Sequence, residues 1–251
     1  TESVSGAGRK ACVNSMSGLL LSLLLGLGST TDPALEAPRQ SCLCLFDVDR
    51  TLTGQQDLGA PQCPVNQVLS GIKDTAYSGG DLTLSQVGQS MAGTFCTQCY
   101  VGIVTAGDAS GANSQERAAL VQRLASRGKL LSQEWSGPSA AGQPRRACKA
   151  SDVFQSTLVA GCLDGTKQEA AKALLTMLSM RGIGILPSNV WLFDDRADNI
   201  HPFQGSGMNA RQISCASRDH RMGTGVCGAT NQEIQEQPGV KLCGREDELV
   251  V

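Results

Sequence analysis

Residues 42–51 read CLCLFDVDRT, and this segment sets the expectation for the fold. Residues 42–48 form a short apolar run without a helical period, which indicates a buried strand. Asp47 stands near the end of that run, and Asp49 follows two residues later. Residues two apart in a strand point to the same side, and a turn beginning at Val48 would aim both carboxylates into one pocket.

Two carboxylates so close together repel each other unless a cation lies between them or one of them is protonated. Mg²⁺ provides the first solution and a general acid the second, and phosphoryl transfer uses both. The alternative is a solvated, Asp-rich turn after a strand. The pattern DxDxT by itself does not separate the two interpretations.

Outside this segment, expected strands alternate with expected helices. We expect strands at residues 100–105 (YVGIVT), 190–193 (VWLF) and 210–215, and helices at 65–73, 84–95, 115–127 (with Ser114 as N-cap) and 166–180; residues 153–159 fit either. This alternation predicts an α/β fold, a Rossmann-like three-layer sandwich with a mostly parallel central sheet. Active sites in such sheets lie beyond the carboxyl ends of the strands, so Asp47, Thr105 and Asp194 are expected on one rim.

Polar residues mark the ends of the other expected elements. Thr105 ends the strand at 100–105, Lys167 begins the helix at 166–180, and Asp194 and Asp195 follow the strand at 190–193. Each has an ordinary explanation, since a lysine in the first turn of a helix, for example, is usually a surface residue. Their common position at element ends, in this order along the chain, favours a shared site.

With these four motifs the chain resembles the haloacid dehalogenase superfamily, specifically its phosphatase branch. The resemblance runs from residue 43 to about residue 200 and does not cover the two ends of the chain. It implies that Asp47 is the nucleophile and Asp49 the general acid/base. It also implies that Thr105 hydrogen-bonds a phosphoryl oxygen and that Lys167 offsets negative charge there, aided by the helix N-terminus.

The resemblance further implies a Mg²⁺ site made from Asp47, the backbone carbonyl of Asp49, and the acidic pair Asp194 and Asp195, because hard oxygen ligands suit Mg²⁺. Two registers fit the motif that contains this acidic pair: Asp194 with Asp198, or Asp195 with Asn199. We prefer Asp194 as the ligand, with Asp198 or Asn199 as its support. Because both acids follow a strand at the open end of the sheet, we expect neither carboxylate to need a buried partner.

The mechanism implied has two steps. Asp47 attacks the phosphorus of a monoester while Asp49 protonates the leaving oxygen, and Asp49 then deprotonates the water that hydrolyses the aspartyl-phosphate. Thr51 and Arg50 are placed with Thr105 and Lys167 as residues that contact the substrate. Arg50 stands where many family members have glycine, and it either reaches the anionic end of the substrate or points to solvent.

The intervals between the motifs, residues 52–104 and 106–166, leave no room for a large cap. A small or absent cap favours a phosphorylated substrate that is bulky, such as a phosphoprotein or a polymer, or closure of the site by a partner subunit. The rival interpretation is a non-catalytic subunit of a larger, membrane-associated assembly. Intact motifs argue against it, since an abandoned site has no reason to keep all five polar groups.

Composition narrows the class of protein. The 251 residues are 41% hydrophobic and 18% charged, as in an ordinary globular protein, and a net charge of -2 gives no long-range attraction for nucleic acid. Aromatic residues are only 4%, so the core is expected to consist mainly of Leu, Val, Ile and Ala. The 11 cysteines are dense for a cytosolic enzyme and indicate disulfides and an oxidising compartment. Their odd number leaves at least one thiol without a partner in the chain.

The chain divides into three parts. In residues 1–40, Arg9 and Lys10 precede an apolar run at 19–27, which fits a secretory or organelle-targeting leader and is too short to span a bilayer; an ordinary buried or partner-binding helix is the alternative. Residues 41–215 form the expected catalytic core, and 216–251 a cysteine-containing tail packed on it. We therefore expect the secretory pathway, the extracellular space or an organelle, rather than the cytoplasm.

Overall fold

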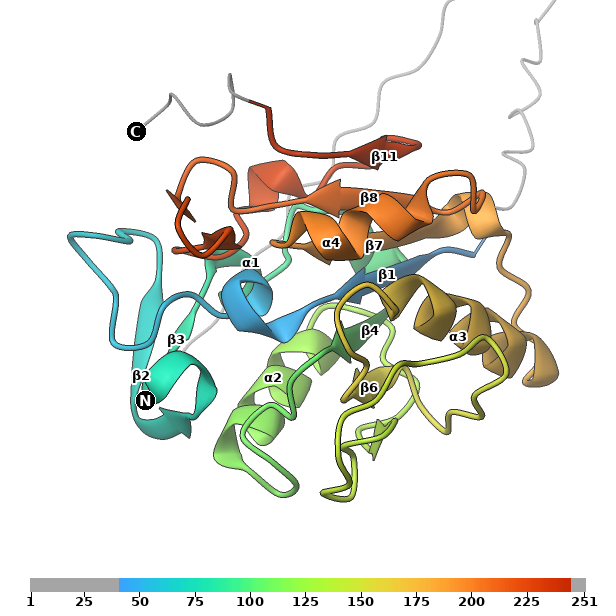
Figure 1. Cartoon of the computed structure of the whole chain (residues 1–251), viewed down its shortest axis with the longest axis horizontal. Coiled ribbons are helices and arrows are strands. Elements are labelled where there is room, and N and C mark those ends of the chain that lie inside the picture. The colour runs from blue at the N-terminus through green and yellow to red at the C-terminus, as the bar shows by residue number, and fades with distance from the viewer. Residues whose placement is uncertain (1–40, 245–251) are drawn as a thin grey trace, which may run out of the picture. The chain divides into compact units, whose positions relative to one another are not determined.

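A seven-stranded parallel sheet forms the centre of the protein (Figure 1). The computed structural model describes residues 41–244. The strand order is β11-β8-β7-β1-β4-β6-β5, and every neighbouring pair is parallel. The strands are β1 (Leu43–Phe46), β4 (Tyr100–Thr105), β5 (Trp135–Ser136), β6 (Leu158–Ala160), β7 (Val190–Asp194), β8 (Asn209–Gln212) and β11 (Val240–Lys241). The prediction of an α/β fold with a largely parallel sheet is confirmed.

Alternating side chains of the sheet pack into two separate apolar layers, one on each face. In β1, Cys44 and Phe46 belong to one layer, whereas Leu43 and Leu45 belong to the other, because successive side chains of a strand point to opposite faces. Helix α2 (Gln115–Ala125) packs in the first layer and α3 (Lys167–Met180) in the second. Helices therefore cover both faces of the sheet, as expected for three layers.

Most of the expected elements form close to their predicted bounds. The expected strands at β1, β4, β7 and β8 are present, and residues 153–159, which fitted either type, lead into β6. Ser114 caps α2 by accepting a hydrogen bond from the Arg117 amide (3.1 Å). The remaining helical pieces are short: α1 (Gln86–Gln89), α4 (Ala197–Ile200), a π-helical turn (Val48–Leu52) and 3-10 turns at Ala76–Ser78, Phe95–Gln98, Pro187–Asn189, His201–Phe203 and Asn231–Glu233.

The helix predicted at residues 65–73 is wrong. These residues form most of β2 (Gln67–Asp74), which pairs antiparallel with β3 (Gly80–Leu84) in a hairpin. The pairing register shifts between Leu69 and Lys73, and Gly71 there has φ +86°. This bulge brings Leu69 and Ile72, three residues apart, into contact with the same apolar layer, which imitates a helical period. The hairpin lies beside the carboxyl ends of the parallel strands, at the left of Figure 1.

The helix predicted at residues 84–95 is mostly wrong as well. Only Gln86–Gln89 is helical, because Ser90 returns to extended backbone and Gly93 takes a positive φ of +84°. Most of residues 90–95 is a loop that leads toward β4.

Residues 216–244 add to the sheet and to the covalent framework. Strand β11 pairs with β8 at the edge of the sheet, and two short strands, β9 (Arg218–Asp219) and β10 (Thr224–Gly225), pair with each other. The expected leader at residues 1–40 and the last seven residues of the expected tail lie outside the described residues. Within the described part of the chain, no helix is long and apolar enough to cross a membrane.

Five disulfides connect the described residues, which confirms the prediction of disulfides and points to an oxidising environment. The pairs are Cys42–Cys99, Cys44–Cys96, Cys63–Cys227, Cys148–Cys162 and Cys215–Cys243. The CxxC at Cys96 and Cys99 is therefore structural, and it fastens the segment before β4 to β1.

Candidate active site

The π-helical turn after β1 places Asp47 and Asp49 at the carboxyl edge of the sheet. The amide of Asp47 donates to the carbonyl of Phe193 in β7 (3.0 Å), so Asp47 still follows the sheet, and its side chain is buried. Val48–Leu52 then turns sharply, with Arg50 in the left-handed region at φ 62°. The Asp49 side chain is half-buried and lines the cavity described below.

Lys167 joins two of the candidate acids at one point. It is the first residue of α3 and is completely buried, and its Nζ lies 2.8 Å from Asp47 Oδ1 and 2.6 Å from Asp194 Oδ2. A buried ammonium needs such partners because its desolvation is costly. The surface lysine that was the ordinary alternative is thus excluded, and the structure brings together the ends of β1, β7 and α3.

Asp194 is held by several buried groups. Its Oδ1 accepts hydrogen bonds from the Asn199 side chain (3.0 Å) and the Arg196 amide (2.9 Å), in addition to the contact with Lys167. Asn199 also contacts Asp164 in the turn before α3 (2.9 Å). The expectation that Asp194 needs no buried partner is therefore wrong, because the loop after β7 folds back over the strand end.

The structure shows which residue supports Asp194. Asn199 contacts Asp194 rather than Asp195, so the observed pair takes its acid from one expected register and its support from the other. Asp198 is not brought to this site, since its carboxylate is 71% exposed and lies 3.4 Å from Arg196 Nη2.

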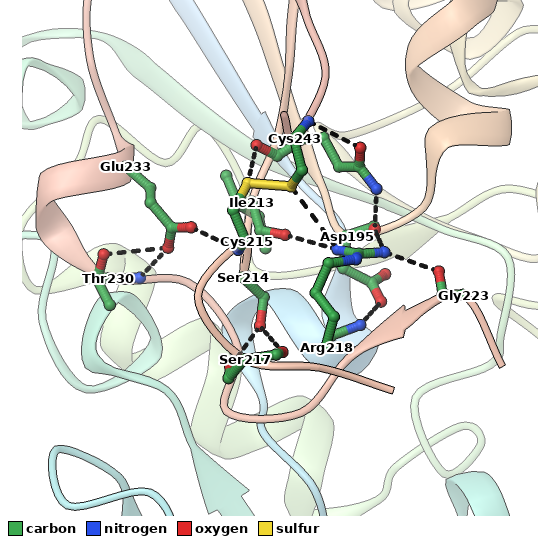
Figure 2. The surroundings of a disulfide bond; sticks show 12 residues. Asp195, Ile213, Ser214, Cys215, Ser217, Arg218, Gly223, Thr230, Glu233 and Cys243 are labelled. Atoms are coloured by element: carbon green, nitrogen blue, oxygen red, sulfur yellow. Dashed lines mark hydrogen bonds between the residues drawn. A yellow bond between two sulfur atoms is a disulfide. The ribbon is translucent and has the colours of Figure 1, made fainter. Parts of the chain in front are cut away.

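Asp195 is buried and is fixed mainly through its backbone (Figure 2). Its carbonyl accepts from Gln212 Nε2 and from Arg218 Nη2, both at 2.9 Å. Figure 2 shows Arg218 and Asp195 beside the Cys215–Cys243 disulfide. One carboxylate oxygen, Oδ2, accepts from the amide of Gly225 in β10. The other, Oδ1, is buried without a hydrogen-bond partner among residues 41–244.

Burial and mutual repulsion shift the pKa values of these acids. Burial raises the pKa of Asp47 to about 6, although Lys167 opposes the rise. The pKa of Asp49 rises to about 8, through burial and the charges of Asp47 and Asp74. Burial and the charge of Asp194 raise the pKa of Asp195 well above its usual range. For Lys167, burial alone would lower the pKa, but Asp194 and Asp47 outweigh it and raise the pKa.

The acids at the ends of β1 and β7 fit a divalent cation. One carboxylate oxygen from each of Asp47, Asp194 and Asp195 lies within 4.8 Å of the others. All three are buried, and the unpartnered Asp195 Oδ1 is the kind of atom that a bound ion would satisfy. An all-oxygen donor set is typical of Mg²⁺ or Ca²⁺ sites.

A cavity of about 830 Å³ opens over Asp47 and Asp49, whereas Asp194, Asp195 and Lys167 do not line it. Thr105 lines it and is buried, at the end of β4 as expected. The hairpin adds residues 74–77 to one wall, and the loop after β4 and the start of α2 add others; further lining residues include Asp108, Glu116, Arg145, Asp164 and Arg196. A sequence pattern marks none of these except Asp164, which lies three residues before Lys167.

Three residues expected at the substrate, Arg50, Thr51 and Lys167, do not line this cavity. Thr51 is completely buried. Arg50 is only 6% exposed, and its guanidinium stacks 4.4 Å above the ring of Tyr77, so it neither reaches into the cavity nor points to solvent. Tyr77 itself lines the cavity, and burial together with Asp195, Asp49 and Asp47 raises its pKa to about 12.

No family model, no curated protein and no solved structure matches this chain. The arguments about function therefore rest on the chemistry of the site.

Proposed function

We propose that the protein is a Mg²⁺-dependent phosphomonoester hydrolase of the haloacid dehalogenase type, with Asp47 as its nucleophile. The observation that carries this proposal is the buried ion-pair arrangement in which Lys167 lies within 2.8 Å of both Asp47 and Asp194. A carboxylate beside a fixed cation, with two more carboxylates that could hold a metal, is suited to receive a transferred phosphoryl group.

The two aspartates of the first motif differ in the way the reaction requires. Asp47 is paired with Lys167, which favours the ionised form that attacks phosphorus. Asp49 has a pKa of about 8, so it holds a proton at neutral pH and can give it to the leaving oxygen. The bond from phosphorus to the leaving oxygen breaks as the bond to Asp47 forms.

In the second step, Asp49 takes a proton from water, and the water oxygen attacks phosphorus. The bond between Asp47 and phosphorus breaks, which releases inorganic phosphate and restores both carboxyl groups. Lys167 neutralises charge beside Asp47 throughout, and the Thr105 hydroxyl, which lines the cavity, would donate to a phosphoryl oxygen.

Asp47, Asp194 and Asp195, with the backbone carbonyl of Asp49, would hold the Mg²⁺. The ion would supply positive charge to the phosphoryl oxygens, where most of the catalysis in phosphoryl transfer arises. Asn199 and the Arg196 amide orient Asp194, whereas Gln212, Arg218 and Gly225 orient Asp195.

The surroundings of the cavity favour a bulky substrate. Of the two intervals between motifs, residues 106–166 supply α2 and two strands of the central sheet, and residues 52–104 supply the β2–β3 hairpin. Because these intervals add only the hairpin, loops and the start of α2 to the lining of the cavity, a phosphoprotein or a phosphorylated polymer could reach Asp47.

Hydrolysis of a generic aryl phosphate, with Mg²⁺ and with a chelator, tests this function. We expect turnover that requires Mg²⁺. Absence of turnover with Mg²⁺, for the aryl phosphate and for a panel of phosphopeptides, would favour the non-catalytic subunit instead.

A further inference from the structure

A second group of acids lies beside Asp49, apart from the Asp47, Asp194 and Asp195 group. Asp49 comes from the π-helical turn, Asp74 from the end of β2 and Glu116 from the first turn of α2. One carboxylate oxygen from each lies within 4.8 Å of the others, and all three residues line the cavity. Three separate elements thus bring three carboxyl groups to one point, with the positive charge of Arg50 near Asp49 and Asp74.

Glu116 is the member that a surface role cannot explain. It is completely buried, although the first turn of a helix is usually solvated. One of its oxygens accepts from the Ser110 hydroxyl, but Oε1 has no hydrogen-bond partner among the described residues. A buried carboxylate oxygen without a partner costs free energy, so its position calls for a ligand or a proton.

Asp74 is in a similar position. It is 1% exposed, and its Oδ1 accepts from the Ala76 amide (2.8 Å). Asp74 Oδ2 is buried without a hydrogen bond among residues 41–244. The side-chain amide of Gln56, which lies nearby, donates to the carbonyl of Ala76 instead (2.7 Å). Burial raises the pKa of Asp74. Burial and the charges of Asp74 and Asp49 raise the pKa of Glu116 to about 8, and burial with the charges of Asp47 and Asp74 raises that of Asp49 to about 8.

We propose that Asp49, Asp74 and Glu116 form a second divalent-cation site. Oxygens that bind a common ion at about 2.4 Å lie no more than about 4.8 Å apart, and the three carboxylate oxygens here lie within that limit. Ca²⁺ binds oxygen at this distance and tolerates irregular geometry, whereas Mg²⁺ requires a shorter distance and a near-ideal octahedron. Ca²⁺, which makes the smaller geometric demand, is therefore the ion with which the site is tested.

An ion bound at this site would change the part that Asp49 plays in catalysis. A carboxylate bound to a metal ion holds no proton, so an ion here would withdraw Asp49 from the proton transfers proposed above. This consequence rests on the proposed function, whereas the existence of the site does not.

Calorimetric titration of the full chain with Ca²⁺ tests the site by counting bound ions. We expect Glu116→Gln to bind one ion fewer than the wild type, because the amide keeps the shape but removes the charge. Asp74→Asn should have the same effect and serves as a second variant if Glu116→Gln does not fold. Glu169→Gln is the matched control, because Glu169 is in the first turn of α3 and pairs at the surface with Lys172 (2.8 Å).

The outcomes separate this site from the first one. If folded Glu116→Gln or Asp74→Asn binds as many ions as the wild type, protons rather than an ion hold the three acids together, and the proposal is wrong. If Asp194→Asn binds as many Mg²⁺ ions as the wild type in a parallel titration with Mg²⁺, the metal site of the proposed phosphatase is wrong, whatever the result for Glu116.

Discussion

Asp47 and Asp49 are two residues apart but occupy different electrostatic surroundings. Asp47 lies 2.8 Å from a buried lysine, and its pKa is raised only to about 6. Asp49 has the acids Asp47 and Asp74 as its strongest charged neighbours, and its pKa rises to about 8. Between these values the first is ionised while the second is protonated, which is the combination that a nucleophile and a general acid require.

Replacement of the nucleophile should abolish the reaction without affecting the fold. We expect Asp47→Asn to retain less than a tenth of wild-type turnover, because an amide is a poor nucleophile. Asp108→Asn is the control, since it removes a cavity carboxylate to which no step is assigned. Turnover of aryl phosphate and circular dichroism are the measurements, and higher residual activity in folded Asp47→Asn would rule out this nucleophile.

The buried acids should make the metal-free protein less stable as the pH rises. The pKa of Glu116 is raised from 4.5 to about 8, so the folded state binds more protons than the unfolded state between these values. Stability is then highest below pH 4.5 and falls up to about pH 8, by on the order of 4 kcal/mol for a shift of this size. Thermal melts in chelator should show this fall in the wild type and a smaller one in Glu116→Gln. Equal slopes would contradict the assignment.

Among the helices and strands, the sequence predicted the correct element wherever one hydrophobic pattern, that of a strand or that of a helix, held throughout the segment. The apolar runs of β1, β4 and β7 and the single apolar face of α3 led to correct elements, and the polar residues at their ends came together as expected. The β2–β3 hairpin was missed because the bulge at Gly71 gives Leu69 and Ile72 a helix-like spacing. Asp74 and Glu116 were missed because they meet only through that hairpin and α2, and no local pattern records this contact.

The segment after β8 links a disulfide to Asp195 of the candidate metal site through hydrogen bonds. Arg218 and Gln212 hold the carbonyl of Asp195, and the amide of Cys243 donates to Gln212 Oε1 (3.0 Å). The Cys215–Cys243 disulfide keeps Cys243 in this position, as Figure 2 shows. Loss of the disulfide should therefore loosen Asp195 as well as the edge of the sheet.

Removal of this disulfide should weaken metal binding. We expect Cys215→Ser with Cys243→Ser to lose about 3 kcal/mol of stability and to show a smaller rise in melting temperature with Mg²⁺, because the ion stabilises the folded state in proportion to its affinity. Cys148→Ser with Cys162→Ser is the control, since it removes a disulfide that closes a different loop, with a sequence separation of 14 against 28 for Cys215–Cys243. An equal rise in melting temperature with Mg²⁺ in both double variants would show that loss of the Cys215–Cys243 disulfide does not specifically weaken metal binding.

At the scale of the whole molecule, disulfides reinforce a core that contains few aromatic residues. Two apolar layers flank the sheet, built mainly from aliphatic side chains, and two disulfides fasten β1 itself to the segment before β4. A third connects Cys63, before the hairpin, to Cys227 near β10. The segment before the hairpin and the segment after β10 are thus fixed by a covalent bond as well as by packing.

The thiol content of the protein should reflect this framework. Ten of the 11 cysteines pair in the five disulfides, and the remaining one, Cys12, lies outside the described residues. We expect at most one reactive thiol when the chain is unfolded without a reductant. All 11 reactive would show that the disulfides do not form and would remove the argument for an oxidising compartment.

The central claim is that Asp47 carries a phosphoryl group during turnover. Mixing the protein with a phosphomonoester and Mg²⁺, quenching with acid within the first turnover, and analysing the peptides by mass spectrometry tests it directly. We expect one phosphoryl group on the peptide that contains Asp47, and none when Asp47→Asn is treated identically. Phosphate release by the wild type with an unmodified Asp47 peptide at every quench time, or with the phosphoryl group on another residue, would contradict the account.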